Sequence, residues 1–280
     1  MLKTILSAIS TRYTPGEARA IAFLILEDAF GITRTEVYAD KVRQFSEEER
    51  LLLQNILSRL SMGEPVQHVL GNARFYGYDF KVTSDTLIPR PETEELVAWT
   101  IELTQKVTQQ EKISLLDGGT GSGCIAITLA REVPNAEVTA WDISENALAI
   151  AQENAIHQKV NVKWEKRNLL EELPAFSSMD FIVSNPPYVC EKEKQDIEPH
   201  VLNFEPATAL FVPDNDPLLF YRALCRMGLH ALKSHGWILM EVNRAYAEET
   251  AQLFREAGYH HVEVRLDQFG QPRMVGAQKD

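Results

Sequence analysis

Hydrophobic residues recur every third or fourth position through the first part of the chain, which is the spacing of amphipathic helices. One such run extends from Ala18 to Ala29 and another from Leu51 to Leu60. Capping-box sequences precede both runs, at Thr14–Glu17 and Ser46–Glu49, and Gly31 and Gly63 end them. The pattern predicts a small helical bundle over residues 1–62. It leaves open whether this bundle only packs or also grips a partner.

The pattern changes at Pro65, where aromatic residues and glycines begin to alternate with polar ones. Val69-Leu70-Gly71 and Phe75–Val82 have the two-residue period that is typical of strands. We therefore expect a β-hairpin that forms a linker over residues 63–84.

From residue 85 onward, short apolar runs alternate with helical patterns such as Cys124–Ala130. This alternation predicts an α/β domain over residues 85–280, with a parallel sheet and ligands at the carboxyl ends of its strands. Near the end of the chain, Val262–Leu266 and Arg273–Ala277 are expected to form an antiparallel pair. The other predicted strands are Ile113–Asp117, Ala136–Trp141, Val160–Trp164, Phe181–Ser184 and Trp237–Glu241.

Composition places the chain among ordinary globular proteins. Its 280 residues leave room for one large or two modest domains, and 45% are hydrophobic and 24% charged. No run of 18 apolar residues occurs, and Met1–Ile5 lacks signal-peptide features, so we expect a cytoplasmic protein without a membrane span. The three cysteines, Cys124, Cys190 and Cys225, are too far apart for a disulfide framework or a metal site.

The net charge of -12 lies entirely in the second part of the chain, because residues 1–83 hold ten acidic and ten basic side chains. An acidic body is a poor partner for duplex DNA, which is bound by neutralising phosphates. We therefore expect no direct contact with nucleic acid. The charge suits a basic protein or one near ribosomal components, although an acidic surface also simply keeps proteins soluble.

A glycine-rich loop follows the predicted strand Ile113–Asp117 and precedes the predicted helix Cys124–Ala130. Glycines let the backbone approach a ligand, and the strand after this helix ends in Asp142, where an acid can accept both hydroxyls of a ribose. Three other kinds of glycine loop are excluded. A P-loop would need lysine at position 124 and a dinucleotide-binding loop would need glycine there, but the residue is Cys124. A nucleophile elbow would need glycine where this chain has Thr120. The ligand class that remains is a nucleoside without a pyrophosphate, and S-adenosyl-L-methionine is such a ligand.

The strand Phe181–Ser184 runs into Asn185-Pro186-Pro187-Tyr188. The two prolines lack a backbone N–H and keep the residues before them extended, so the strand must stop there. We expect the Asn185 carboxamide to be free, with its oxygen and the Pro186 carbonyl accepting two hydrogen bonds from an –NH2 group. Tyr188 supplies a flat face to cover a planar group. For this motif alone, a plain turn with an aromatic anchor is the alternative.

Four further positions are candidates for binding. Asn168 follows Val160–Trp164 and either reads the adenine ring or serves as a turn residue, and Leu169 can pack against the adenine face. Arg90 and Glu92 stand in an unusual Pro-Arg-Pro-Glu stretch, and we place them at the rim of the active site, where they bind substrate. Acids in a first helical turn also suit the helix dipole, which is the simpler interpretation of Glu92.

With these motifs, the chain resembles the HemK/PrmC family, the release factor glutamine methyltransferases, over its whole length. The Asn-Pro-Pro-Tyr motif alone is shared with adenine, RNA and other amino-methyltransferases, but its combination with Leu87–Glu94 and a helical N-terminal part is far more specific. Family members often have leucine where this chain has Gly118, and usually an acid at Asn168. The matching residues are Leu87–Glu94, Asp117–Gly123, Asp142, Asn185–Tyr188, Glu205-Pro206-Ala207 and Tyr221-Arg222.

The resemblance implies a Rossmann-like, seven-stranded α/β domain that transfers a methyl group from S-adenosyl-L-methionine to the glutamine amide in the Gly-Gly-Gln loop of class-I peptide release factors. Asn185, Pro186 and Tyr188 would be catalytic, and Pro187 would join them in binding substrate. We expect a monomer whose N-terminal bundle recognises the substrate. The expected cofactor-binding residues are Gly119, Thr120, Gly121, Ser122, Gly123, Asp142, Asn168, Leu169 and Asn185.

Three alternatives stay open at this point. A glutamine methyltransferase of a ribosomal protein shares the same motif. An adenine amino-methyltransferase is disfavoured by the charge of -12. A cofactor-binding module without activity is disfavoured because Asn185 and Tyr188 are intact.

Overall fold

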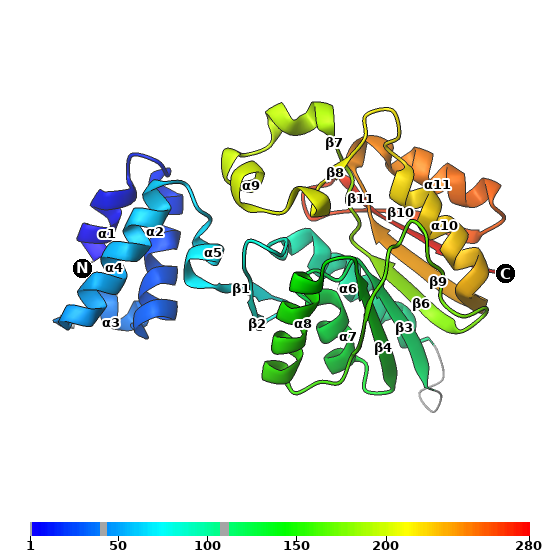
Figure 1. Ribbon diagram of the computed structural model, residues 1–280, viewed down its shortest axis with the longest axis horizontal. Coiled ribbons are helices and arrows are strands. Elements are labelled where there is room, and N and C mark those ends of the chain that lie inside the picture. Colours follow the sequence, from blue (N-terminus) through cyan, green and yellow to red (C-terminus); the bar gives the residue numbers. More distant parts are fainter. Residues whose placement is uncertain (1, 40–43, 107–111) are drawn as a thin grey trace. The chain divides into compact units, whose positions relative to one another are not determined.

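The computed structural model describes residues 2–39, 44–106 and 112–280. These residues form two compact units, one from Met1–Asn72 with Glu198–Phe204 and the other from Ala73–Ile197 with Glu205–Asp280. The units are drawn together in Figure 1, and each is described here by itself. The sequence-based division at residues 62 and 84 stays a prediction.

The first unit is helical, with a core that includes Ile5, Ile25 and Leu60. Both expected capping boxes are confirmed, because Thr14 and Ser46 each accept the N–H three residues on while Glu17 and Glu49 reach back. The helices are α1 Leu2–Ile9, α2 Pro15–Leu24, the π-helix η1 Ile25–Ala29, α3 Arg34–Tyr38, α4 Glu47–Ser61, α5 Val66–Leu70 and α9 Pro199–Phe204.

A two-stranded hairpin follows, with β1 at Asn72–Phe75 and β2 at Tyr78–Lys81. Tyr76 and Gly77 both have positive φ, 50° and 79°, as a two-residue hairpin turn of matching twist requires. The prediction of a strand at Val69-Leu70 is wrong, since these residues lie in α5. This short helix ends at Gly71, which has a φ of 71° and so closes a helix rather than extending a strand.

The second unit is built on a seven-stranded sheet of order β10-β11-β9-β6-β3-β4-β5, which confirms the predicted α/β class. The five strands from β9 to β5 are parallel, whereas β11 runs antiparallel to β9 and to β10. The strands are β3 Ile113–Gly118, β4 Ala136–Asp142, β5 Lys163–Lys166, β6 Met179–Ser184, β9 Leu232–Glu241, β10 His260–Leu266 and β11 Pro272–Gln278.

One strand begins later than expected. The prediction placed it at Val160–Trp164, but β5 starts at Lys163. Lys159 takes the left-handed conformation at the end of α8, and the Val160 N–H donates back to the Ala155 carbonyl. Val160 therefore finishes the helix before the strand can start.

Helices cover both faces of the sheet (Figure 1). Adjacent residues of β3 point to opposite faces: Leu115 packs with residues of α6, α7 and α8, and Leu116 packs with residues of α10 and α11. These helices are α6 Pro91–Thr104, α7 Cys124–Glu132, α8 Glu145–Gln158, α10 Leu219–Ala231 and α11 Ala247–Glu256. The smaller elements are β7 Val189–Cys190, β8 Phe211–Val212, η2 Glu191–Asp196, η3 Ala207–Ala209 and η4 Arg244–Tyr246.

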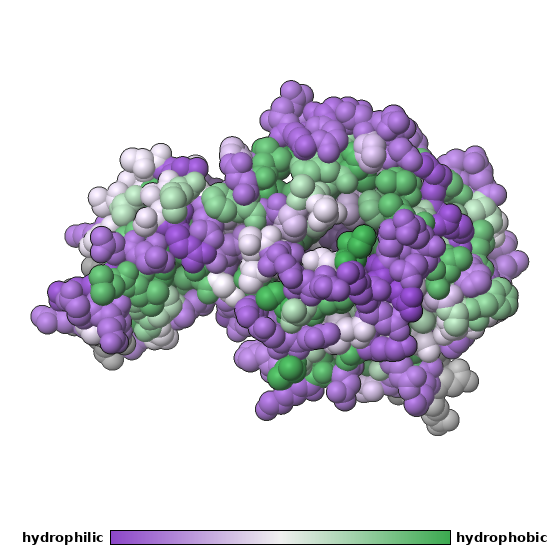
Figure 2. Space-filling view, viewed as in Figure 1, coloured by the Kyte–Doolittle hydropathy of each residue, from purple (hydrophilic) through white to green (hydrophobic). Residues whose placement is uncertain are grey.

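The surface turned toward the viewer in Figure 2 is mostly hydrophilic, with a hollow in the larger unit beside which apolar groups are exposed. Within the described ranges, no helix is long and apolar enough to cross a membrane. The same residues contain no cluster of three metal-ligating side chains.

Candidate active site

The candidate site lies where the central parallel strands end. Gly118 of β3 pairs with Trp141 of β4 and with Ser184 of β6. Ser184 in turn pairs with Met240 of β9. The residues one position further on therefore form a row across the carboxyl edge of the sheet, in the order Asp142, Gly119, Asn185 and Glu241. Three of these four were predicted site residues, and the sheet brings them together as expected.

The glycine loop is held to the sheet by its own backbone. The N–H groups of Gly119 and Thr120 both donate to the Trp141 carbonyl, at 2.9 Å. Asp117 is buried, and its Oδ2 accepts hydrogen bonds from the Thr120 hydroxyl at 2.6 Å and from the Ala126 N–H at 3.1 Å. Burial raises the pKa of Asp117 to about 7.

The glycines of this loop have different roles. A Cβ on Gly119 would lie 3.7 Å from Leu169 Cδ1 and 4.0 Å from the Asn185 carbonyl oxygen, so this glycine faces the end of β6. A Cβ on Gly123 would lie only 2.9 Å from Ile127 Cδ1, so the packing around this position leaves no room for a side chain. Every second residue of the loop has a positive φ: 77° at Gly119, 55° at Gly121 and 83° at Gly123. Glycine adopts this conformation readily, which explains why glycines alternate in the motif.

The Asp142 carboxylate is already oriented by two backbone groups. Its Oδ2 accepts the Gly121 N–H at 2.8 Å and its Oδ1 accepts the Ser144 N–H at 2.9 Å. Burial raises the pKa of Asp142, while these hydrogen bonds oppose the rise. Each carboxylate oxygen can accept more than one hydrogen bond, so acceptors for two ribose hydroxyls are still present.

Asn168 and Leu169 lie where the chain leaves β5. The Asn168 side-chain oxygen accepts the Leu170 N–H at 3.0 Å, which is the turn role that the sequence left open. The Asn168 amide nitrogen would be the group left to donate to an adenine ring nitrogen, a role that stays a prediction. Leu169 is 6% exposed and stands against Gly118 and Gly119, as packing on a bound ring would require.

The Asn185 carboxamide is not wholly free, contrary to the sequence-based expectation. Its Nδ2 donates a hydrogen bond to the hydroxyl of Thr93, at 3.1 Å. Thr93 is buried in the first turn of α6, 92 residues away in sequence. The remaining polar atom of the carboxamide is Oδ1, and Pro186 is buried beside it.

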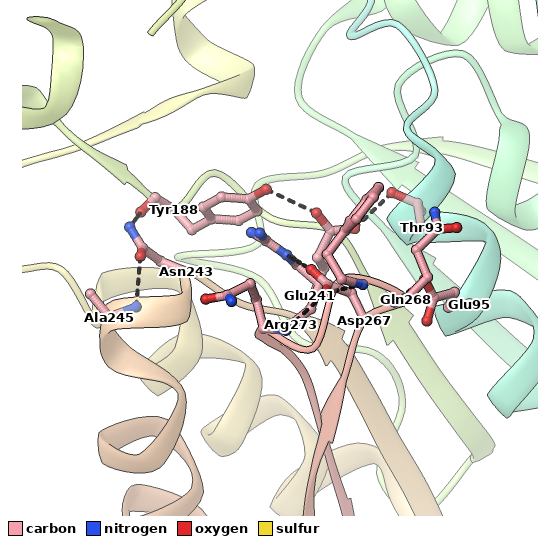
Figure 3. A network of polar contacts seen from close by, with 11 residues as sticks. Thr93, Glu95, Tyr188, Glu241, Asn243, Ala245, Asp267, Gln268 and Arg273 are labelled. Carbon is pink, nitrogen blue, oxygen red and sulfur yellow. Dashed lines mark hydrogen bonds and ion pairs between the residues drawn. The ribbon is translucent and has the colours of Figure 1, made fainter. Parts of the chain in front are cut away.

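The Glu241 carboxylate connects Thr93 with Tyr188. Its Oε2 accepts the Thr93 hydroxyl at 2.7 Å, and its Oε1 accepts the Tyr188 hydroxyl at 2.9 Å (Figure 3). Glu241 is 1% exposed, and burial raises the pKa of its carboxyl despite these hydrogen bonds and the positive Arg273. Burial and the Glu241 carboxylate together hold the pKa of Tyr188 well above its usual value. The Tyr188 phenol is therefore a proton donor to Glu241 and no base.

Arg90 is tied to a buried carboxylate in the same unit. Its Nη2 pairs with Glu205 Oε1 at 2.7 Å, and Glu205 Oε2 accepts the Ile88 N–H at 3.0 Å. The pair joins two segments that carry the family resemblance, Leu87–Glu94 and Glu205–Ala207. Glu92 is close enough to Glu241 for its charge to raise the pKa of Glu241. The substrate-binding roles of Arg90 and Glu92 stay predictions.

Sequence reasoning missed two residues of this site, Thr93 and Glu241. Thr93 was read only as part of the Pro-Arg-Pro-Glu-Thr-Glu stretch, and Glu241 only as the end of a strand. A signal for Glu241 was present, because a lone acid that ends the apolar run Trp237–Met240 is costly to bury without hydrogen-bond donors.

The residues present fit S-adenosyl-L-methionine. Gly119 leaves space that a Cβ would fill, 3.7 Å from Leu169 Cδ1, whereas Gly118 packs directly against Leu169. Asp117 Oδ1 is buried and has no hydrogen-bond partner among the described residues, so it can accept a donor of a bound ligand. Asp142 offers acceptors at the next strand end.

Comparison with known proteins supports this interpretation. A solved methyltransferase from Pyrococcus furiosus aligns with a TM-score of 0.52 at 16% identity, over 84% of this chain and 99% of that one. This likeness concerns the fold alone. Residues 100–205 match the methyltransferase small domain, and residues 2–71 match the PrmC N-terminal domain.

Two relatives extend over nearly the whole chain. The release factor glutamine methyltransferase of Flavobacterium psychrophilum is 38% identical over 96% of this chain and 94% of its own length. That of Bacteroides thetaiotaomicron is 41% identical over 95% of each chain. The protein therefore belongs to the release factor glutamine methyltransferase family.

Proposed function

We propose that the protein transfers a methyl group from S-adenosyl-L-methionine to the side-chain amide nitrogen of the glutamine in the Gly-Gly-Gln loop of class-I peptide release factors. The observation that carries this proposal is the held carboxamide of Asn185. Its nitrogen is occupied by Thr93, so its oxygen is the group left to accept a hydrogen bond at the carboxyl edge of the sheet. An acceptor there suits an –NH2 substrate.

The cofactor would be held on the β3, β4 and β5 side of this edge. When bound, S-adenosyl-L-methionine would supply an electrophilic methyl carbon, and the electron pair of the broken S–CH3 bond would stay on sulfur in a neutral thioether product. The Asp142 carboxylate would accept the ribose hydroxyls, Leu169 would pack on the adenine, and Asn168 would donate to a ring nitrogen. The glycine loop gives close backbone approach. The full set that we assign is Gly119, Thr120, Gly121, Ser122, Gly123, Asp142, Asn168, Leu169 and Asn185.

The substrate amide requires orientation more than a base, because its nitrogen lone pair is delocalised. Asn185 Oδ1 and the Pro186 carbonyl accept its two N–H bonds and turn the lone pair toward the methyl carbon. The same acceptors stabilise the positive charge that develops on nitrogen. The methylated nitrogen is strongly acidic and releases its proton to solvent. Tyr188 covers the amide face, and Pro187, Arg90 and Glu92 line the approach.

The N-terminal bundle, residues 1–62, is proposed to recognise the release factor, with residues 63–84 as the linker to the methyltransferase domain at residues 85–280. We further propose that the protein acts as a cytoplasmic monomer without contacting nucleic acid. The net charge of -12 supports a protein partner over a nucleic acid.

The test is methyl transfer from labelled S-adenosyl-L-methionine to a purified class-I release factor, beside a release factor whose Gly-Gly-Gln glutamine is replaced by alanine. The proposal predicts label on the wild-type factor alone. Label on both factors would contradict the assigned target residue. No label on either, with the cofactor still bound, would contradict the proposed substrate and favour the glutamine of a ribosomal protein.

A further inference from the structure

A hydrogen-bonded chain connects the buried Glu241 carboxylate to the Asn185 carboxamide. Thr93 Oγ1 lies 2.7 Å from Glu241 Oε2 and 3.1 Å from Asn185 Nδ2. Both Thr93 and Glu241 are nearly inaccessible, at 2% and 1% exposure. Thr93 comes from α6, Asn185 follows β6 and Glu241 ends β9, so three separate elements position this chain. Figure 3 shows the Thr93 and Glu241 part of it.

The direction of each hydrogen bond follows from the chemistry at Glu241. An ionised carboxylate can only accept, and a threonine hydroxyl has a single proton to donate. Thr93 gives this proton to Glu241, so toward Asn185 it can only accept. Asn185 must then present its –NH2 group to Thr93, which turns Oδ1 away from α6. Without this constraint the two ends of a carboxamide are nearly equivalent in shape.

We infer that Glu241 and Thr93 are positioning residues that hold the Asn185 carboxamide in the one orientation that accepts a hydrogen bond from the substrate amide. This inference rests on the proposed function of Asn185. A reversed carboxamide would present its own N–H groups to the substrate N–H groups, so that neither amide would have an acceptor. The Tyr188 hydroxyl satisfies the other Glu241 oxygen and so strengthens the acceptor-only state.

The test removes the Thr93 hydroxyl while keeping the shape of the side chain. Thr93→Val should lower kcat by about 10- to 100-fold, which is somewhat less than the loss of a full transition-state hydrogen bond. Thr93→Ser keeps the hydroxyl and should restore kcat to within about threefold of the wild type. Cofactor affinity should stay within about twofold in both variants, because Thr93 has no contact with the glycine loop or Asp142 among the described contacts.

Thr100→Val is the matched control. Thr100 is a buried threonine of the same helix, and among the described residues its hydroxyl donates to the Leu96 carbonyl alone. Its kcat should be unchanged, and its thermal midpoint should fall less than that of Thr93→Val, which also removes a donor from the buried Glu241 carboxylate. If Thr93→Val does not fold, Thr93→Ala removes the same hydroxyl from a smaller side chain and carries the same expectation.

Asn185→Ala separates this inference from the proposed function. If Asn185→Ala abolishes turnover while Thr93→Val keeps full kcat, the positioning role is wrong and the function of Asn185 stands. If Asn185→Ala itself keeps full kcat, the assigned role of Asn185 fails. A Thr93→Ser variant as slow as Thr93→Val would also overturn the inference, since the hydroxyl would then not be the cause.

Discussion

The two halves of the carboxyl edge of the sheet are built in different ways. On the β3–β4 half, a loop of successive residues positions itself through backbone hydrogen bonds and glycine conformations, from Asp117 to Gly123. On the β6–β9 half, side chains that are 53 to 148 residues apart position one another around Glu241. At one edge of the sheet, the loop that we propose to hold the cofactor is encoded locally, whereas the side chains that we propose to act on the substrate come together only after folding.

The comparison predicts that changes in the two halves affect different quantities. The largest expected effect is that of Asn185→Ala, which should lower kcat by about 100- to 1,000-fold, because it removes the acceptor that we propose stabilises the transition state. The dissociation constant of the cofactor should change far less, by under about threefold, because Asn185 is only one of the nine residues assigned to cofactor binding. Single-turnover methyl transfer and isothermal titration measure the two quantities. Equal losses in both would break the distinction between the halves.

The converse change is Asp142→Ala. It removes the acceptors proposed for both ribose hydroxyls, and hydrogen bonds to a charged group contribute about 1.5–3 kcal/mol each. The dissociation constant of S-adenosyl-L-methionine should rise by about 10- to 100-fold, while kcat at saturating cofactor changes little. Asp142→Asn retains one acceptor and should give a smaller rise. A fall in kcat without weaker binding would place Asp142 in the reactive half.

The pH dependence sharpens the same comparison. Burial raises the pKa of Glu241, Arg273 lowers it, and the nearby Glu92 raises it. As the pH falls through this raised value, Glu241 gains a proton and is no longer restricted to accepting hydrogen bonds. At saturating cofactor, kcat should therefore decline on the acid side at a pH above the usual value of about 4.3 for glutamate.

Saturating cofactor is essential in that measurement, because Asp117 has a pKa of about 7 and lies in the binding half. Its protonation should weaken cofactor binding as the pH falls through about 7, with kcat unaffected once the site is saturated. Glu241→Gln should lose the acid limb of kcat and keep the pH dependence of binding. An acid limb of kcat that persists in Glu241→Gln would assign it to another group.

The smallest effect concerns stability. In Gly123→Ala the new Cβ would lie 2.9 Å from Ile127 Cδ1 and 3.0 Å from Ala151 Cβ, at a φ of 83°. Overpacking of this kind costs about 1–3 kcal/mol, in addition to the strain of the left-handed conformation. In Gly121→Ala the new Cβ would meet no atom within 4 Å, so this variant should be destabilised only by the strain of the left-handed conformation. The midpoint of thermal unfolding should be lower for Gly123→Ala than for Gly121→Ala. The reverse order would contradict the packing role of Gly123.

The local half of the site could be predicted from the sequence because its interactions join near neighbours. The order of strand, glycine loop, helix and Asp142 is visible in the chain, and the structure places these residues at one edge. Helix starts at Thr14 and Ser46 were predictable for the same reason, since each capping box spans four residues.

The reactive half could not be predicted in full because its partners are distant in sequence. Nothing near Asn185 indicates that its amide nitrogen bonds to Thr93, and nothing near Glu241 indicates that two hydroxyl donors satisfy it. The errors at Val69-Leu70 and Val160 have a local cause, since left-handed residues at Gly71 and Lys159 decide where a helix ends. The short apolar runs there suggested strands instead.

The most direct test of the account is the double variant Asn185→Ala/Asp142→Ala, measured beside both single variants. If the two halves act separately, the double variant should show the cofactor dissociation constant of Asp142→Ala and the single-turnover rate of Asn185→Ala, with the free-energy changes adding to within about 0.5 kcal/mol. Strong non-additivity, or a single variant that changes binding and rate equally, would contradict the division of the site into a binding half and a reactive half.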